Sequence, residues 1–307
     1  MNEAAIVIEH VGRRFGELQA VRDVTLAVER GEIFGLVGPD GAGKTTLIRM
    51  LAGVLHPDTG RIVLEGIDVA ADPERAKTAL GYMPQRFGLY EDLTVDENAF
   101  FYGELFEVPR KDYRVRMAQL LDAAGLAPFR KRLAGQLSGG MKQKLGLVCA
   151  LIHTPKVLLL DEPTTGVDPV SRRDFWAILY QLRDQGVTIV MSTAYMDEAQ
   201  RCSRLALLHA GEVRDCATPD ALKRNLRGAL LAIAGAAPRA IRDALAAAPG
   251  VLGVLLMGDR VHVRVDDVSR SAELEARLSA AAIDHTSIET IEPGIEDIFV
   301  ALVGDTG

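Results

Sequence analysis

A glycine-rich run in the first fifty residues has the residue types and spacing that bind phosphate. It comprises Gly38, Pro39, Asp40, Gly41, Ala42, Gly43, Lys44 and Thr45, and Thr46 follows it. The run fits the pattern G-x-x-x-x-G-K-[ST] and lies between a predicted strand at 33–37 and a predicted helix at 44–51. Its glycines allow backbone N–H groups to turn inward around phosphate, and the helix N-terminus adds positive potential. Lys44 would neutralise β- and γ-phosphates, and Thr45 would ligate Mg²⁺.

A second candidate is a pair of carboxylates, Asp161 and Glu162, directly after a buried-strand pattern at 157–160. A carboxylate at the end of such a strand would place Asp161 beside the metal ion. Glu162 would point elsewhere and could polarise a water molecule. Because charged residues commonly end buried strands, the pair alone would be weak. In a chain that also has a phosphate loop, it predicts the second half of a phosphate and Mg²⁺ site.

The elements that must position these residues alternate between strand and helix through about the first two thirds of the chain. Strands are expected at 6–8, 24–28, 33–37, 157–160, 187–191 and 205–208, and helices at 44–51 and 171–185. Between about 84 and 155 the apolar spacing becomes helical, with helices at 98–106, 113–124 and 141–152. The fold class is therefore α/β, with a mostly parallel sheet over residues 1–222 and a helical subdomain inserted at about 84–155.

The last third has a different pattern and predicts a separate domain at 223–307. Strands are expected at 229–234, 251–257, 261–265 and 286–291, and helices at 220–226, 237–248, 272–281 and 295–303. After the first, connecting helix the order is βαββαβ, which predicts a small ferredoxin-like α+β domain. This tail contains no phosphate or carboxylate-pair motif. Its expected role is regulation or dimer contact.

The composition excludes several classes of protein. With 48% hydrophobic and 25% charged residues, the 307-residue chain is an ordinary globular mixture and not a disordered one. Its longest weakly polar stretch, 244–258, is too short to span a bilayer, and the N-terminus has no signal-peptide pattern. A net charge of −7 argues against a nucleic-acid partner. The scattered cysteines, Cys149, Cys202 and Cys216, are expected to be reduced thiols of a cytosolic protein.

The motif that indicates a family is Leu137-Ser138-Gly139-Gly140-Met141, which lies between the phosphate loop and the carboxylate pair. It resembles the signature motif of ABC-transporter ATPases, and the resemblance covers about residues 5–217. The resemblance implies a P-loop ABC ATPase domain that takes ATP and Mg²⁺. It also implies that Ser138, Gly139 and Gly140 form an anion site at a helix N-terminus, which completes the ATP pocket of another subunit.

The same resemblance assigns further residues. Phe15 stands where an aromatic ring stacks on adenine, with a core phenylalanine as the alternative. Gln85 matches the glutamine that contacts Mg²⁺ and senses the membrane partner, with a surface glutamine as the alternative. Asp168 matches the loop that crosses the dimer interface. Two positions depart from the family pattern: Asp40 replaces the usual asparagine, and Ala194 stands where a histidine usually holds the γ-phosphate and the attacking water.

The branch of the family is indicated by residues 82–85, 90–95 and 138–145 and by the tail at 293–299. These are similar to ABC exporters of drugs, lipids or polysaccharides. Within that branch the chain resembles a multidrug-efflux type that joins two ATPase halves in one chain, and it looks like the first half.

These resemblances imply a cytoplasmic ATPase subunit, held at the inner face of the cell membrane by integral-membrane permease subunits. A second ABC ATPase domain, in a homodimer or a heterodimer, would complete its sites, and no nucleic acid is expected. One alternative is a regulatory half that binds ATP and barely hydrolyses it, as the alanine at 194 suggests. Another is a soluble ABC ATPase that acts on ribosomes or DNA. The transported substrate is not encoded in this chain, because the membrane subunits carry its pathway.

Overall fold

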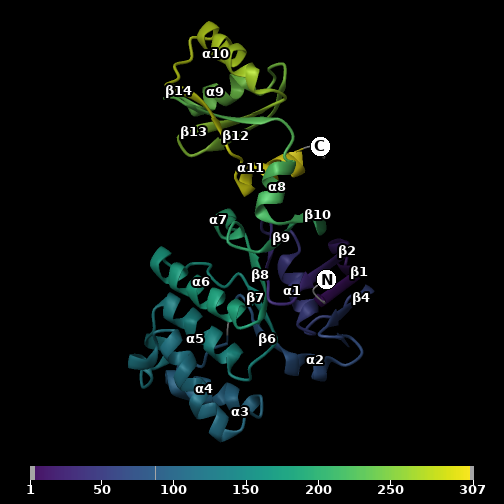
Figure 1. Cartoon of the computed structure of the whole chain (residues 1–307), viewed down its shortest axis with the longest axis vertical. Helices are drawn as coiled ribbons and strands as arrows, with labels where there is room; N and C mark the ends of the chain where they lie inside the picture. The colour runs from purple at the N-terminus through teal and green to yellow at the C-terminus, as the bar shows by residue number, and fades with distance from the viewer. Residues whose placement is uncertain (1–3, 87, 305–307) are drawn as a thin grey trace. The chain divides into compact units, whose positions relative to one another are not determined.

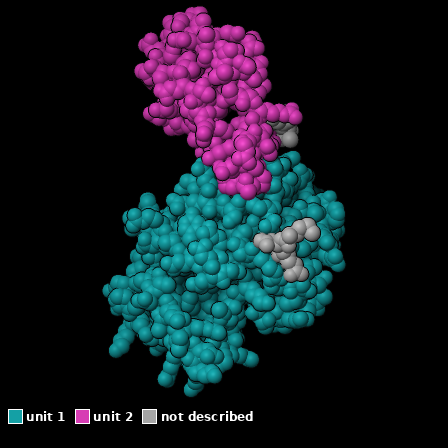
Figure 2. All heavy atoms as spheres, in the orientation of Figure 1, with its two compact units in different colours: residues 1–216 teal, residues 217–307 magenta. Residues whose placement is uncertain are grey.

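The computed structural model describes residues 4–86 and 88–304 and divides the chain into two compact units, Met1–Cys216 and Ala217–Gly307 (Figure 2). The predicted boundary after residue 222 lies a few residues later than this division, within helix α8 (Pro219–Asn225). The physical reason is that α8 packs against the last helix of the second unit, α11 (Ile295–Gly304). Among the described residues, no helix is both long enough and apolar enough to cross a membrane.

The centre of the first unit is a six-stranded sheet in the order β10-β9-β3-β8-β7-β6. The strands are β3 (Ile33–Val37), β6 (Leu80–Met83), β7 (Val157–Asp161), β8 (Thr188–Thr193), β9 (Arg204–His209) and β10 (Glu212–Ala217). The pairs β6–β7, β7–β8, β8–β3 and β3–β9 are parallel, which confirms the predicted parallel sheet. Every residue of β3, β7 and β8 is buried, as expected of parallel strands covered on both faces.

A second, antiparallel sheet has the order β2-β1-β4-β5. Its strands are β1 (Ala4–Phe15), β2 (Leu18–Glu29), β4 (Thr59–Leu64) and β5 (Ile67–Asp68). The predicted strands at 6–8 and 24–28 cover only the part of β1 and β2 away from the hairpin turn, where Ile6 pairs with Val28. Polar positions beyond it, such as Arg14 opposite Gln19, are kept in the strands by pairing across the hairpin and not by burial.

Helices cover the two faces of the central sheet differently (Figure 1). On one side lie α1 (Lys44–Leu51), α2 (Pro73–Ala79) and the antiparallel sheet. On the other lie α3 (Val95–Leu105), α4 (Arg110–Ala123), α5 (Gly139–Leu151) and α6 (Pro169–Asp184). The predicted helical subdomain is thus confirmed as α3 to α5, with two short 3₁₀ turns, Ala127–Phe129 and Ala134–Gln136, before α5. Helix α3 begins earlier than predicted because Thr94 and Glu97 form a capping box.

The second unit has the predicted βαββαβ order and sheet order β12-β13-β11-β14, with antiparallel pairs throughout. Its elements are β11 (Ala229–Ala234), α9 (Pro238–Leu245), β12 (Val251–Met257), β13 (Arg260–Val265), a 3₁₀ turn (Val268–Arg270), α10 (Ser271–Ala280) and β14 (Ser287–Ile291). This is the ferredoxin-like arrangement. Its core packs α9 and α10 on one face of the sheet, and His262 of β13 contacts Asp297 of α11 at 2.7 Å.

Candidate functional site

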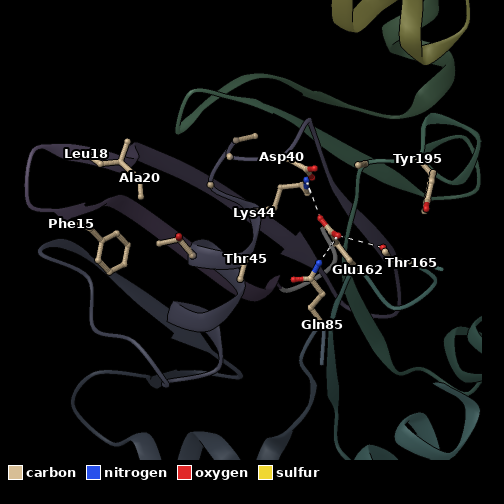
Figure 3. A pocket seen from close by; sticks show the side chains of 15 residues that line it. Phe15, Leu18, Ala20, Asp40, Lys44, Thr45, Gln85, Glu162, Thr165 and Tyr195 are labelled. Atoms are coloured by element: carbon tan, nitrogen blue, oxygen red, sulfur yellow. Dashed lines mark hydrogen bonds and ion pairs between the residues drawn. The ribbon is translucent and has the colours of Figure 1, made fainter. Parts of the chain in front are cut away.

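A cavity of about 650 Å³ opens where several strands of the first unit end (Figure 3). The parallel strands β3, β6, β7 and β8 all place their carboxyl ends toward it, as the crevice rule for α/β sheets predicts. The β1–β2 hairpin supplies another part of the wall. The lining residues are Phe15, Leu18, Ala20, Asp40, Gly41, Ala42, Gly43, Lys44, Thr45, Thr46, Gln85, Glu162, Thr165, Ala194 and Tyr195.

The phosphate loop needs glycine at two positions because the backbone approaches other backbone closely there. A Cβ on Gly38 would lie 2.2 Å from the carbonyl oxygen of Leu208. A Cβ on Gly43 would lie 2.4 Å from the carbonyl oxygen of Ala20, and Gly43 has a φ of 102° in the left-handed region. Gly38 itself does not line the cavity and instead fixes the start of the loop.

Lys44 is buried and forms contacts within its own loop and with the carboxylate pair. Its Nζ donates hydrogen bonds to the carbonyl oxygens of Gly38, at 2.8 Å, and Pro39, at 3.0 Å. The same ammonium lies 3.2 Å from Oε1 of Glu162. Glu162 has a φ of 48°, an uncommon conformation for a residue with a side chain, which aims its carboxylate at the loop. Lys44 and Glu162 therefore neutralise one another in this structure.

Asp161 lies at the inner end of the site and is buried. Its Oδ1 accepts hydrogen bonds from Thr45 Oγ1 at 3.0 Å and from Ser192 Oγ at 2.7 Å. Its Oδ2 is buried and has no hydrogen-bond partner. A buried carboxylate oxygen without a partner, next to a threonine hydroxyl, is the donor set that Mg²⁺ prefers, so the residues present fit this ion.

Gln85 and Thr165 hold the other oxygen of Glu162. Gln85 Nε2 donates to Oε2 at 3.0 Å, and Thr165 Oγ1 donates to the same atom at 3.4 Å. Figure 3 shows Lys44 and Gln85 pointing at Glu162 from different sides. The structure thus brings Gln85, Glu162 and Lys44 together, although they are far apart in the sequence.

Phe15 lies at the opposite end of the cavity from Tyr195 (Figure 3). Its side chain is 46% exposed, so the alternative of a core phenylalanine is wrong. The Arg13 guanidinium lies 5.1 Å from the centre of its ring. An exposed ring of this kind leaves one face open to stack on a base, and adenine stacking stays a prediction.

Gly38, Pro39 and Asp161 adjoin the residues that line the cavity without lining it themselves. Four further predicted site residues, on helices α5 and α6 or at their starts, also lie outside its lining. Ser138 caps α5, with its Oγ accepting from the backbone N–H of Met141 at 3.3 Å, and Gly139 and Gly140 form the first turn of that helix. Asp168 caps α6. Hydrogen bonds from the Ser171 side chain and backbone lower the pKa of Asp168. None of the four lines the cavity around Lys44 of this chain.

Several residues that the sequence analysis did not select belong to the site. Ser192 joins the carboxylate pair, because its Oγ donates to Asp161 and accepts from the backbone N–H of Glu162 at 2.9 Å. Leu18, Ala20, Thr165 and Tyr195 line the cavity without any motif of their own. Only their places near strand ends could have suggested them.

Ala194 is exposed and lines the cavity, in the position that the family pattern gives to histidine. Among the residues that the structure describes, no histidine lines this cavity. His153 instead stacks on Phe106, with ring centres 3.9 Å apart. His209 lies in β9, so neither histidine substitutes for Ala194.

Comparisons with known proteins agree with this geometry. The family model described as "ABC transporter" matches residues 21–165. The daunorubicin resistance ATP-binding protein DrrA3 of Streptomyces coeruleorubidus is 33% identical over 309 residues, which covers 99% of this chain and 98% of that protein. The chain belongs to the ABC transporter ATP-binding family.

Two further matches bear on how this ABC protein works. It is 40% identical over its whole length to the probable multidrug ABC transporter ATP-binding protein YbhF of Escherichia coli (strain K12), and it covers only 53% of that protein. The chain thus spans about half the length of this curated relative. A dimeric ATP-binding cassette in a post-hydrolysis state, bound to ADP and phosphate, aligns with a TM-score of 0.63 and 26% identity, covering 69% of this chain and 98% of the other.

Proposed function

We propose that this ABC protein is the ATPase subunit of an exporter and that it couples ATP binding and hydrolysis to transport by separate membrane subunits. The observation that carries the proposal is that Lys44 and Glu162 line one cavity of about 650 Å³, while Asp161 is hydrogen-bonded to Thr45 of the same lining. A phosphate-binding lysine, a metal-binding carboxylate and a second carboxylate able to polarise water are the groups that ATP hydrolysis needs.

The contacts suggest an order of events within the chain. Lys44 exchanges Glu162 for phosphate oxygens of ATP, and this exchange frees the Glu162 carboxylate to accept a proton from an attacking water. Thr45 and Asp161 would hold Mg²⁺, which supplies positive charge to the phosphates when it is bound. Gln85 stays within hydrogen-bond distance of Glu162 and so links the hydrolytic residue to the segment that follows β6.

A second ATPase domain is part of this proposal. Ser138, Gly139, Gly140 and Asp168 do not line this chain's own cavity. The N-terminus of α5, formed by the first three, can bind the phosphates of ATP held in another domain's cavity. The dimeric ATP-binding cassette that aligns with this chain supports a pair of ATPase domains. Because the chain matches about half of YbhF, the second domain can be another copy or a different half.

The permease contact is proposed for the segment after Gln85 and for α3. Tyr90, Phe100 and Phe101 are 46%, 43% and 38% exposed, and the rings of Tyr90 and Phe101 pack 4.7 Å apart. Aromatic side chains gathered on an exposed surface are typical of an interface. Phe87, within the same segment, lies outside the described residues. Such a contact would hold the ATPase on the cytoplasmic face of the membrane.

The relatives suggest that the cargo is a drug-like molecule, since DrrA3 is named for daunorubicin resistance and YbhF for multidrug transport. One specific observation favours a second candidate function, a regulatory half with slow hydrolysis. Ala194 has no side-chain donor for the γ-phosphate. Electrostatic donors of this type are worth about 10²–10³ in rate.

The test of the proposal is Mg-ATP binding and hydrolysis by the full chain, with Lys44→Ala as the matched variant. Lys44→Ala should lose most ATP affinity because its ammonium is the cation placed inside the phosphate loop. ATP binding that persists in this variant would contradict the assignment of the cavity. Copurification with membranes, and not with ribosomes, tests the exporter role.

A further inference from the structure

A buried carboxylate outside the cavity, Glu198, contacts groups from three separate segments. It lies in α7 (Met196–Ala199) and is 0% exposed. Its Oε1 accepts hydrogen bonds from Thr164 Oγ1 at 2.7 Å and from Trp176 Nε1 at 3.4 Å. Its Oε2 accepts from Thr193 Oγ1 at 3.0 Å, and Arg172 Nε lies 3.4 Å from Oε1. All four partners are donors, so both oxygens of the buried carboxylate are satisfied.

Two of these partners adjoin residues that line the cavity. Thr164 directly precedes Thr165, whose Oγ1 donates to Glu162 at 3.4 Å. Thr193 directly precedes Ala194, and its Oγ1 also accepts from the backbone N–H of Tyr195 at 3.0 Å. Glu198 thus fixes both walls that flank Glu162 while lying outside the cavity itself.

The other two partners lie on α6, the helix that Asp168 caps. This helix also packs against the start of α5, because a Cβ on Gly140 would lie 2.5 Å from Ser171 Oγ. Helix α6 therefore contacts Glu198 through Arg172 and Trp176. The same helix is capped by Asp168, one proposed dimer contact, and packs against the start of α5, which is another.

We infer that Glu198 is a positioning residue for ATP hydrolysis, which joins the walls around Glu162 to the helix that faces the second ATPase domain. This inference rests on the proposed ATPase function of the cavity. Trp176 and Arg172 can only donate, and both threonine hydroxyls donate here, so a carboxylate accepts from all four partners. A glutamine would remove the charge opposite Arg172, and its NH₂ group would reverse at least one hydrogen bond to a threonine. Since Glu198 does not line the cavity, its replacement should change the rate of hydrolysis and not the affinity for ATP.

The experiment compares the wild-type chain with Glu198→Gln, measuring Kd for Mg-ATP and the single-turnover hydrolysis rate with protein in excess. Kd should stay within about twofold, and the rate should fall by about tenfold or more, as displaced catalytic groups cause. The matched control is Glu32→Gln. Glu32 is also a buried carboxylate of this unit, 7% exposed and bound to Arg204 at 3.1 Å, but it does not line the cavity. Its replacement should leave the rate unchanged.

A second pair of variants guards against loss of folding in Glu198→Gln. Thr164→Val keeps the shape of the side chain and removes the hydroxyl, whereas Thr164→Ser keeps the hydroxyl. The valine variant should lower the rate and the serine variant should keep it. A wild-type hydrolysis rate in Glu198→Gln, or equal hydrolysis rates in the two Thr164 variants, would overturn the inference about Glu198 and leave the proposed ATPase function standing. A wild-type chain that binds no Mg-ATP would overturn the proposed function as well.

Discussion

Replacing Glu162 with glutamine should tighten ATP binding while it stops hydrolysis. The reason is that Glu162 competes with ATP for Lys44: the Nζ–Oε1 distance is 3.2 Å, and the two side chains are only 4% and 11% exposed. At that distance the Coulomb attraction is about 5 kcal/mol for an effective dielectric constant of about 20. Both charges lose hydration in forming the pair. The net value is therefore closer to the 1.5–3 kcal/mol that is typical, at roughly that size, of hydrogen bonds to charged groups.

Removing this competition predicts about 10–100-fold tighter binding of Mg-ATP. The loss of the group that polarises water predicts a hydrolysis rate lower by about 10²–10⁴. Isothermal titration calorimetry measures the affinity, and phosphate release measures the rate. Asp40→Asn is the control for net charge, because Asp40 lines the same cavity and no ion pair joins it to Lys44 among the described residues. Its effect on affinity should be much smaller. Unchanged or weaker ATP binding by a folded Glu162→Gln protein would refute the competition.

Three other predictions test separate parts of the molecule. Ala194→His should raise steady-state ATP turnover by about 10-fold or more, because it adds the hydrogen-bond donor for the γ-phosphate that alanine lacks. The Glu162→Gln variant measures the contaminating ATPase activity to be subtracted. An unchanged turnover would show that Ala194 does not limit hydrolysis. Removing residues 218–307 should leave the affinity for Mg-ATP intact, because each unit has its own hydrophobic core. Dimerisation, or the coupling of ATP hydrolysis to transport, should change. Loss of Mg-ATP binding by a folded truncated chain would place part of the site in the tail. Burial lowers the pKa of His153 in the folded chain, and the nearby Arg116 charge also lowers it. In the unfolded chain His153 therefore takes up its proton at a higher pH, near about 6.5, than in the folded chain. Its contribution to the free energy of unfolding is complete above that pH and is lost as the pH falls toward the pKa of the folded state. Urea unfolding at pH 7.5 and 5.5 should show this loss in the wild type and a smaller one in His153→Gln; equal losses would exclude His153 as the cause.

Much of the site could be predicted because its groups lie next to one another in the chain. The phosphate loop needs glycine for close approaches such as that of Gly43 to Ala20, and this local requirement makes the motif recognisable. Asp161 ends a strand of four apolar residues, which marks it as a group held at the edge of a sheet. The order of elements in residues 229–291 was also clear, since alternating burial and tight turns are local properties.

The positions of Ser138 and Asp168 show the limit of such local patterns. Both cap helices, and the cap residues can be recognised from the sequence. That they lie away from the cavity of the same chain depends on how α5 and α6 pack. The extent of β1 and β2 was likewise underestimated, because their polar ends are stabilised by partners on another strand.

The sequence by itself determined which residues can bind phosphate and metal, because that chemistry depends on residue type and on spacing within one turn of chain. Only the tertiary structure decided that Lys44 contacts Glu162, that Ser192 bridges the two carboxylates, and that Glu198 joins three segments. Apart from the contact between Thr193 and Glu198, these contacts join residues that are 22 or more positions apart. Such contacts depend on strand order and on side-chain packing in the interior, and no local sequence pattern encodes them.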